Sequence, residues 1–564
     1  MNISTKSPTK ETEYPHLCYD ANRDFIWLFN KPWIWIPRLI EIISLIFVFI
    51  YKFITQRAKE DQNVQKKLAK SLLTTITKLG PCFIKTGQSL STRPDLIQQD
   101  WLEELINLQD NLPAFDHQQA LEILENEIGT SIENVFEYFP DRPIASASLG
   151  QVYKAKLKKN NWVAVKIQRP NLIHIIRRDI VIIRVISTIF SPILPLNLGF
   201  NLGEIIDEFG ISLFKEIDYE QEADNAEKFA SLFANEPSIV IPNVIRSIST
   251  RKVITTSWID GLKLKEPLEL TQKGINPSSI IRTAVRSGLQ QLLEFGYFHA
   301  DPHPGNIFAL KSKDKNIGTL GYVDFGMMDS ISDDDRITLT KAIVHLINKD
   351  YYLLAADFQK LGFLSKKENI DKLIPVLENV LGEVLSRDVN SFNIKKITDK
   401  FSELMYDYPF RVPARFALII RAVVSQEGLA LKLDPKFKIL RFAYPYVAKR
   451  LLTDQNDEML QILTEVMFDS KANIRVDRVE ALLNVIGEEY VTPGAELIPV
   501  ARDGIKLLVS SKGALIRKKL LLSLIKDEKI NANQMKELLK LIRRTYSPRK
   551  FLRAISTKVK TLSV

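Results

Sequence analysis

Apolar residues recur every three or four positions along much of this 564-residue chain. Before residue 137 they form three runs: Leu68, Leu72, Ile76 and Leu79; Leu102, Leu105 and Leu108; and Leu121, Ile123 and Leu124. This spacing predicts amphipathic helices, which we expect to be interrupted at Pro81, Pro94 and Pro113. Two later stripes have the same period: Leu373, Val376, Leu377, Val380, Leu381 and Val384; and Leu482, Leu483, Val485 and Ile486. We interpret these stripes as core-packing faces rather than as a cofactor-binding segment.

Two short runs between the helical regions have a different pattern. Gln151–Ala155 and Trp162–Lys166 are rich in β-branched and aromatic residues, which predicts two strands. The apolar stretch Ile180–Phe190, closed by Pro192, is better explained as a buried helix than as a second membrane anchor. Helices before and after a region with strands predict an α+β fold.

The N-terminal segment Phe25–Ile54 combines tryptophans with a continuous apolar stretch. It contains Trp27, Trp33 and Trp35, and its uncharged run Ile42–Tyr51 has ten residues, whereas a membrane-spanning helix needs about 20. Tryptophans beside a short apolar helix are typical of an interfacial anchor. We therefore predict binding at a membrane interface, with a helix packed on the protein's own core and a true span as alternatives. No small-residue cleavage site follows, so we do not expect a signal peptide.

Composition and charge narrow the class of partner. The chain is 45% apolar and 26% charged, and its two cysteines, Cys18 and Cys82, exclude a disulfide framework and a cysteine metal site. This composition is typical of an intracellular globular protein. The net charge of +10 favours an anionic partner.

The positive charge is concentrated at the C-terminal end. The stretch Leu538–Val564 has no acidic residue and contains Lys540, Arg543, Arg544, Arg549, Lys550, Arg553, Lys558 and Lys560. A solvated basic tail is one interpretation; the other is attraction to an anionic leaflet, at about 1 kcal/mol per well-placed basic residue. We find no signature of a nucleic-acid-binding fold and expect no nucleic-acid partner. With the N-terminal segment, the tail favours peripheral association with an anionic membrane.

Residues capable of phosphoryl-transfer chemistry lie near the middle of the chain. The segment His299–Asn306 places Asp301 five positions before Asn306, and Asp324-Phe325-Gly326 begins eighteen positions later. Kinases use this spacing to place a catalytic carboxylate and a metal-binding amide, while the later aspartate holds the Mg²⁺ that bridges the nucleotide phosphates. Taken alone, the first segment is also explained as a rigid proline turn.

Elements typical of a nucleotide-binding region precede this segment in the expected order. Val163-Ala164-Val165-Lys166 is a short strand that ends in a lysine, like the strand lysine that binds the α and β phosphates. Upstream, Ala145–Val152 reads Ala-x-Ala-x-x-Gly where a glycine-rich loop reads Gly-x-Gly-x-x-Gly, and we expect the two methyl groups to stiffen the loop. The stretch Val253–Gly261 is typical of a strand and hinge. We predict that ATP or ADP, with Mg²⁺, contacts Ala145, Ala147, Ser148, Gly150, Val152, Ala164, Lys166, Ser257 and Ile259.

Two further motifs point to one family. Lys85-Thr86-Gly87-Gln88 lies far upstream, and Glu216-Ile217-Asp218 precedes Glu222. With these motifs the chain closely resembles the UbiB/AarF/ADCK family of atypical kinases, from about residue 60 to about residue 345. The resemblance implies a two-lobed protein-kinase-like fold with helical N-terminal and C-terminal extensions.

The resemblance also implies a role for each motif. Lys166 would pair with Glu222, Asn306 and Asp324 would bind the metal, and Asp301 would be the catalytic-loop aspartate. Lys85 and Gln88 would lie over the active site, near Glu216 and Asp218, where a protein substrate would otherwise dock. Lys85 would thereby belong to the catalytic set, and Gln88, Glu216 and Asp218 would be regulatory.

Family members are linked to isoprenoid quinone metabolism, with ATPase activity favoured over protein phosphorylation. The resemblance therefore implies quinone-biosynthesis proteins or prenyl-phenolic lipids as partners. Two residues differ from those of ordinary protein kinases: Ala300 replaces the arginine that binds a phosphorylated activation loop, and His303 stands where protein kinases usually have a lysine. A third residue, Ser257, departs from the family, in which an acidic residue is usual at this hinge position. The first two argue against a peptide acceptor, and the third leaves the nucleotide preference open.

We predict five parts along the chain: a polar tail and apolar aromatic membrane-associating segment (1–60), a helical extension with the Lys85 motif (61–137), a kinase-like N-lobe with inserted helices (138–261), the C-lobe catalytic core (262–345), and a helical remainder with a basic C-terminal extension (346–564). The predicted function is an atypical kinase or ATPase that supports prenyl-quinone metabolism at a membrane. A nucleotide- and lipid-binding pseudokinase scaffold and a small-molecule kinase are the alternatives. The pattern indicates neither the acceptor nor the oligomeric state.

Overall fold

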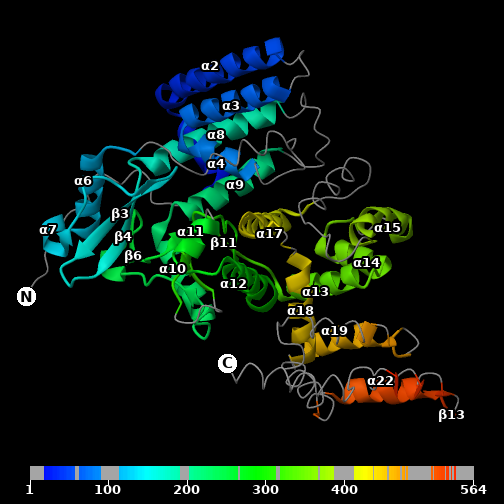
Figure 1. Ribbon diagram of the computed structural model, residues 1–564. Coiled ribbons are helices and arrows are strands. Elements are labelled where there is room, and N and C mark those ends of the chain that lie inside the picture. The colour runs from blue at the N-terminus through cyan, green and yellow to red at the C-terminus, as the bar shows by residue number, and fades with distance from the viewer. Residues whose placement is uncertain are drawn as a thin grey trace, which may run out of the picture. The chain divides into compact units, whose positions relative to one another are not determined.

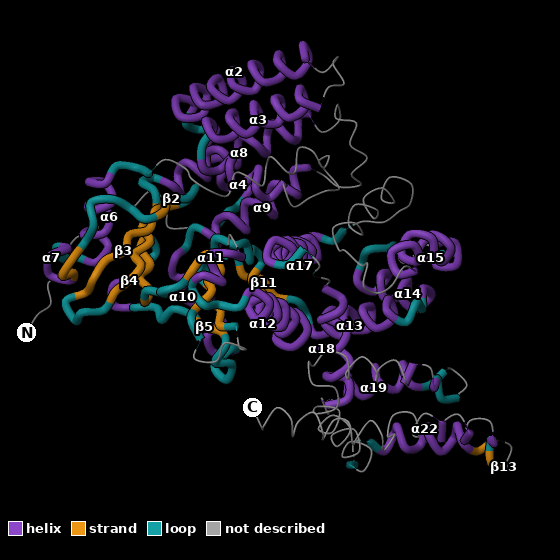
Figure 2. The backbone as a smooth tube through the Cα atoms, in the orientation of Figure 1, coloured by secondary structure: helices purple, strands orange, loops and turns teal. Residues whose placement is uncertain are grey.

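The computed structural model describes residues 18–56, 62–90, 114–190, 202–264, 267–312, 318–365, 369–386 and 412–435, and, with short gaps, parts of 437–479 and 510–540. The chain divides into two compact units (Figures 1 and 2). The first comprises residues 1–263, 299–310 and 319–328, and the second comprises 264–298, 311–318 and 329–564. Every residue predicted to contact nucleotide or metal belongs to the first unit.

The first unit contains a layer of helices formed largely before and between the strands. Its members are α1 (Ala21–Phe29), α2 (Pro32–Gln56), α3 (Gln62–Leu79), α4 (Pro81–Leu90), α8 (Leu172–Phe190) and α9 (Leu202–Glu216). In Figure 1, α2, α3, α4 and α8 lie alongside one another. The helices predicted from the run Leu68–Leu79 and from Ile180–Phe190 are confirmed as α3 and the second half of α8. The predicted Leu102–Leu108 and Leu482–Ile486 helices lie outside the described residues.

A five-stranded antiparallel sheet contains most of the residues that are predicted to contact nucleotide. Its strands are β1 (Phe136–Tyr138), β2 (Ala145–Ser146), β3 (Gly150–Leu157), β4 (Trp162–Gln168) and β6 (Val253–Ser257), in the order β1-β3-β4-β6 with β2 beside β3. One face packs against α6 (His117–Ile128) through the fully buried Tyr153, Ala155, Val163, Val165 and Ile167. Because side chains alternate along a strand, the paired residues Val152 and Lys166 face away from this core. The predicted strands are thus confirmed, with lysine on the open face.

A second, four-stranded sheet lies next to the segments predicted to be catalytic. Its strands are β5 (Ile239–Val240), β7 (Leu262–Lys263), β9 (Ile307–Leu310) and β10 (Thr319–Tyr322), in the order β5-β10-β9-β7. β9 and β10 are antiparallel, with Ile307 opposite Tyr322. Asn306 and Val323, the next residue outward on each strand, therefore lie close to each other. The unit is completed by α7 (Ile132–Val135), α10 (Tyr219–Leu232) and the short 3-10 turn η2 (Arg246–Ile248).

The second unit is almost entirely helical in its described residues. Its elements are α11 (Pro267–Gln272), α12 (Pro277–Leu289), the π-helical turn η3 (Gln290–Phe295), α13 (Asp333–Ile347), α14 (Tyr351–Leu361), α15 (Ile370–Ser386), α17 (Ala414–Leu433), α18 (Ile439–Thr453), α19 (Asp457–Met467), α22 (Ala514–Leu524), β12 (Ile525–Lys526) and β13 (Lys529–Ile530). The short strands β8 (Tyr297–His299) and β11 (Met328–Ser330) lie where the chain passes between units. A buried hydrogen bond of 2.6 Å between His345 and Asp357 joins α13 to α14.

Buried ion pairs join α1 and α2 to α8, another helix of the same layer. The Arg38 guanidinium of α2 makes two bonds to the Asp179 carboxylate of α8, at 3.1 and 2.8 Å, and also donates to the Leu79 carbonyl at the end of α3. Two residues before Asp179, Arg177 of α8 lies 3.4 Å from Asp24 of α1, and both side chains are fully buried. Paired charges in a low-dielectric interior require fixed geometry, so α1 and α2 have defined positions on α8.

The two faces of α2 have different environments. Ile42 is fully buried, and with Leu28, Leu79, Val181 and Ile182 it forms a core cluster. The opposite face is apolar and 42–70% exposed at Trp33, Ile36, Ile40, Ile43, Phe47, Ile50 and Ile54. The helix has 25 residues, longer than the uncharged run of the sequence, and by length and composition alone Pro32–Thr55 could cross a membrane. One of its faces nevertheless belongs to the core of the first unit.

Replacing Arg38 by methionine should therefore destabilise the first unit. Removing one partner of a buried ion pair typically costs about 3–5 kcal/mol, but Asp179 keeps a 2.7 Å bond from Arg178, so we expect a loss of about 2–3 kcal/mol. Urea unfolding followed by tryptophan fluorescence measures it, because Trp27, Trp33 and Trp35 lie in or beside these helices.

Arg178→Met is the matched control, since Arg178 contacts the same carboxylate from a partly exposed position. It should cost less than about 1 kcal/mol. Equal losses in the two variants would show that the buried Arg38 pair does not anchor α2.

Candidate functional site

One ammonium group lies between two carboxylates at the centre of the first unit. Lys166 of β4 donates to both oxygens of Glu222, at 2.9 and 2.8 Å, and to Asp324 Oδ1 at 3.0 Å. Glu222 comes from the first turn of α10, and Asp324 follows β10. Residues 56 and 158 positions from Lys166 are thus brought to the same nitrogen.

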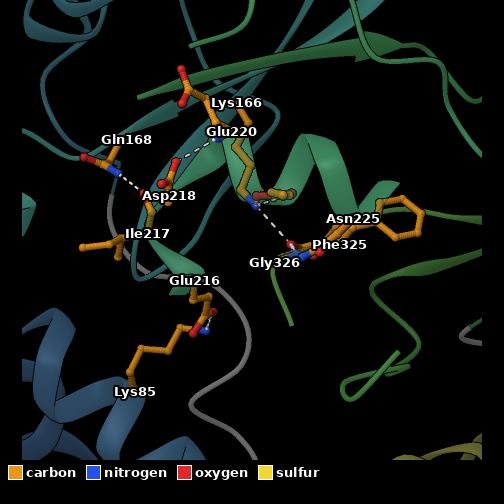
Figure 3. Close-up of polar contacts among 12 residues, drawn as sticks. Lys85, Lys166, Gln168, Glu216, Ile217, Asp218, Glu220, Asn225, Phe325 and Gly326 are labelled. Atoms are coloured by element: carbon orange, nitrogen blue, oxygen red, sulfur yellow. Dashed lines mark hydrogen bonds and ion pairs between the residues drawn. The ribbon is translucent and has the colours of Figure 1, made fainter. Parts of the chain in front are cut away.

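The segment that carries Asp324 is fixed by its neighbours. Phe325 is buried and packs against Phe229 of α10 and His299, with ring centroids 5.4 and 6.0 Å apart. Its carbonyl accepts a 2.9 Å hydrogen bond from the Asn225 amide group (Figure 3). Asp324 has φ of +64°, a left-handed backbone conformation that costs energy for a residue with a side chain and is found at functional sites. With Phe325 in the core, 46% of the Asp324 side chain stays exposed.

The loop from Asp301 to Asn306 is a compact turn held to the same segment. The Asn306 side-chain amide donates to the Asp301 carbonyl at 3.3 Å, and the Asp301 amide donates to His299 Nδ1 at 3.1 Å. The Asn306 carbonyl accepts from the amide of Val323, directly before Asp324. Because the amide nitrogen of Asn306 is used within the loop, its side-chain oxygen is the end left for a cation. The structure thus brings the two predicted metal ligands to adjacent strand ends.

Electrostatics distinguish the three charged groups. Burial raises the pKa of Glu222 to about 7, with Asp324 adding to the effect and Lys166 opposing it. Burial also disfavours the Lys166 charge, but Asp324 and Glu222 together raise the pKa of its ammonium well above the usual value. For Asp324, the penalty of burial is outweighed by Lys166, and further by Lys85, so its pKa lies well below the usual range. Asp324 is therefore the permanently charged and most accessible carboxylate.

The Lys85 motif reaches this centre from the helical layer. Lys85 of α4 forms an ion pair with Glu216 at the end of α9 (Figure 3). A Cβ atom placed on Gly326 would lie 3.5 Å from Glu216 Cγ and 3.7 Å from Glu222 Oε2, so Glu216 also borders the Asp324 segment. Gln88 is buried one turn after Lys85 on the same helix.

The turn between Glu216 and α10 is held from the sheet. Asp218 caps α10 by accepting from the Glu220 amide at 3.1 Å, and the Gln168 side chain donates to the Ile217 carbonyl at 2.7 Å (Figure 3). The predicted regulatory residues Glu216 and Asp218 thus have different local tasks: the first is an ion-pair partner of Lys85, and the second fixes the start of the helix that carries Glu222.

The alanine-rich loop is a tight turn between β2 and β3. The Ala147 amide donates to the Gly150 carbonyl at 2.8 Å, Ala145 and Ala147 are exposed, and Ser148 is buried. Arg169, which the motif analysis missed, donates to the Ala147 carbonyl at 3.0 and 3.2 Å. Its own amide donates to the Leu149 carbonyl. The loop is therefore held by a side chain that follows β4.

Ser257, at the end of β6, forms two hydrogen bonds with Asn243. Its amide donates to the Asn243 carbonyl, and its hydroxyl accepts from the Asn243 amide, both at 2.9 Å. The following Trp258 amide donates to the Trp162 carbonyl. Of the two predicted hinge contacts, Ser257 thus has both its backbone amide and its hydroxyl engaged with a neighbouring loop, while Ile259 lies beyond the paired part of the strand.

The side chains around Lys166 fit a nucleotide with Mg²⁺. The open face carries Val152, Ala164 and the cation Lys166, and the oxygen ligands are one carboxylate and one side-chain amide, which suits a hard cation completed by phosphate oxygens and water. No group of three or more His, Cys, Asp or Glu side chains among the described residues could hold a metal alone.

The raised pKa of Glu222 predicts a pH-dependent stability without nucleotide. The folded protein binds a proton here near pH 7, whereas an unfolded chain binds it near pH 4.3. The stabilisation that the bound proton gives to the folded protein is thus present at low pH and is lost as the pH rises through about 7. Glu222→Gln should therefore be more stable, relative to wild type, at pH 8 than at pH 6.

Thermal unfolding at the two pH values measures this difference. Lys166 keeps Asp324 as a partner, so its charge is not left uncompensated. Glu220→Gln, on the exposed side of the same helix, is the control and should show no such trend. A constant difference between Glu222→Gln and wild type would exclude titration of Glu222.

Comparison with known proteins finds relatives that match most of this chain. A family model of the ABC1 atypical kinase-like domain matches residues 107–357. The protein slr1919 of Synechocystis is 43% identical over 547 residues, which cover 97% of this chain and 95% of that protein. The chloroplastic Activity of BC1 Complex Kinase 1 of Arabidopsis thaliana is 37% identical over 90% of this chain and 75% of the relative.

Among solved structures, the complex of Rv3197 with erythromycin from Mycobacterium tuberculosis matches 68% of this chain and 98% of that one, at 25% identity and a TM-score of 0.45. The sequence similarity extends over nearly the whole chain and includes the motifs that meet around Lys166. This protein therefore belongs to the ABC1 atypical kinase-like family, the UbiB/AarF/ADCK group that its motifs resemble.

Proposed function

We propose that this protein binds MgATP and hydrolyses it or transfers its phosphoryl group to a small acceptor. The observation that carries the proposal is the arrangement of Lys166, Glu222 and Asp324 beside the Asp301–Asn306 loop. A scaffold has no physical need for a lysine shared by two carboxylates, because two like charges close together repel each other and destabilise the fold.

Each residue then has a definite task. Glu222 orients the Lys166 ammonium toward the nucleotide phosphates, and the Asp324 carboxylate and the Asn306 side-chain oxygen would hold Mg²⁺. When bound, the cation offsets the charge that develops on the phosphates. Asp301 would accept the proton of the attacking hydroxyl or water.

Several features favour water or a small acceptor over a protein substrate. The ion pair of Lys85 with Glu216 places α4 beside the Asp324 segment. His303 stands in the lysine position of protein kinases, and Ala300 is buried in place of an arginine. We include prenyl-quinone metabolism in the proposal because of the family resemblance, with prenyl-phenolic lipids as the class of acceptor or regulator.

We further propose that the exposed face of α2 lies on an anionic membrane surface. Its apolar side chains project from a helix whose opposite face is fixed to α8, so lipid can cover the outer face without unfolding the inner one. The buried pair of Arg38 with Asp179 favours a helix lying along the surface over an isolated span. The basic tail would add electrostatic attraction; of its eight basic residues, only Lys540 lies within the described part of the chain.

The test of the catalytic proposal separates binding from chemistry. Asp324→Asn should lose most of the thermal stabilisation by MgATP, because a neutral amide binds the cation weakly. Asp301→Asn should keep that stabilisation and lose ADP release by at least about tenfold. Asp333→Asn, at an exposed carboxylate in the second unit, should resemble wild type. A wild-type protein that is stabilised by MgATP but releases no ADP, with or without a phenolic quinone-precursor mimic, would be a pseudokinase.

Point substitutions test the membrane proposal better than truncation, because deleting residues 1–56 would remove core side chains such as Ile42. Ile40→Ser with Phe47→Ser changes two exposed side chains, each worth about 1.5–3 kcal/mol when moved from water into lipid. We expect binding to anionic vesicles to fall by about tenfold or more at every salt concentration, with unchanged unfolding temperature.

The matched control is Leu521→Ser with Leu522→Ser, because these side chains are similarly exposed on α22. Co-sedimentation with phosphatidylserine vesicles compares the three proteins. Equal binding by all three would assign the exposed face of α2 to something other than lipid.

A further inference from the structure

Tyr219 has a buried hydroxyl group beside the proposed nucleotide site, and this hydroxyl has no hydrogen-bond partner among the described residues. Tyr219 is the first residue of α10, and its side chain is 1% exposed. Leaving a buried hydroxyl unbonded costs free energy, so nearly all such groups in folded proteins have a partner.

The surroundings of Tyr219 define where that partner must lie. Its ring is 5.0 Å from Lys166 Nζ, in cation–π contact with the ammonium. Its hydroxyl lies against the last residue of the alanine-rich loop: a Cβ atom on Gly150 would be only 2.5 Å from the oxygen. The ring of Tyr219 therefore contacts the lysine that is proposed to bind the phosphates, and its hydroxyl lies against the alanine-rich loop.

Packing alone does not explain the hydroxyl. The ring fills a small core with Ala223, Ile254 and Val244, and the Tyr219 amide donates to the Arg251 carbonyl. Phenylalanine would satisfy all of these contacts and would not bury an unpaired oxygen. Burial raises the pKa of Tyr219, so the hydroxyl stays protonated and is a hydrogen-bond donor.

We propose that the Tyr219 hydroxyl donates a hydrogen bond to a phosphate oxygen of the nucleotide bound at Lys166. Tyr219 is then a phosphate-binding residue that joins the end of the Glu216–Asp218 turn to the alanine-rich loop. A Cβ atom on Gly150 would lie only 2.5 Å from this hydroxyl and 2.5 Å from the Ile167 carbonyl oxygen, so the position requires glycine. This inference rests on the proposed MgATP function and adds a phosphate contact to it.

The experiment compares Tyr219→Phe with Tyr153→Phe in the full-length protein. Tyr153 is a fully buried tyrosine on the opposite face of the same sheet, and its hydroxyl is bonded to Gln151 at 2.6 Å and to His117 at 3.1 Å. Affinities for MgATP, MgADP and adenosine are measured by displacement of a fluorescent nucleotide, and unfolding temperatures are measured without nucleotide.

We expect Tyr219→Phe to bind MgATP and MgADP about tenfold more weakly, with unchanged adenosine affinity and an unfolding temperature equal to or above that of wild type. Tyr153→Phe should do the reverse, unfolding at lower temperature with unchanged nucleotide affinities. Wild-type affinities in a stable Tyr219→Phe protein would overturn the proposal, as would equal losses for adenosine and MgADP. If the wild type binds neither nucleotide, the proposed function itself fails.

Discussion

The first unit depends on a charge imbalance: one ammonium, Lys166, serves two carboxylates on different elements. The arrangement is held together by the surrounding fold and not by its own attraction, because two carboxylates near one cation repel each other in a poorly solvated site. Glu222 carries most of the penalty, as its raised pKa indicates. A positive charge beside Asp324 would reduce the repulsion between the two carboxylates, and the MgATP proposed for this site would bring one.

One helix, α10, connects the separate motifs around Lys166. α10 contributes Glu222, Asn225 and Phe229, which respectively contact the lysine, the Phe325 carbonyl and the Phe325 ring. A shift of this helix would therefore move Glu222 and the segment that carries Asp324 together. Its first turn is fixed by Asp218 and by the Gln168 bond to Ile217, so the turn that follows Glu216 sets the positions of both carboxylates through one helix.

The sequence predicted more of the site than of its supports. Motif order and spacing predicted that Lys166, Asp301, Asn306 and Asp324 belong to one site, and the family resemblance added Glu222 as the partner of Lys166; the structure brings these segments together. Runs of β-branched and aromatic residues predicted the strands around Lys166, and apolar residues every three or four positions predicted helices such as α3. The sequence did not predict the roles of Arg169 and Tyr219. Arg169 binds a backbone carbonyl and the Tyr219 hydroxyl lies against Gly150, and no local sequence pattern specifies contacts of this kind. The only available signal was indirect: an arginine directly after the lysine strand and a tyrosine directly after the acidic motif.

The N-terminal helices also depend on a contact that the sequence pattern could not predict. Arg38 and Asp179 interrupt apolar helical stretches, and each alone suggests a helix end or a solvated position. Only their pairing across 141 residues makes them core residues, and partner choice at that distance is a property of tertiary packing. The same guanidinium also binds the Leu79 carbonyl, two residues before the helix that carries Lys85. The helix with the exposed apolar face and the helix that reaches Glu216 are therefore positioned by one buried side chain, so that α2 cannot leave α8 without releasing a constraint on α4.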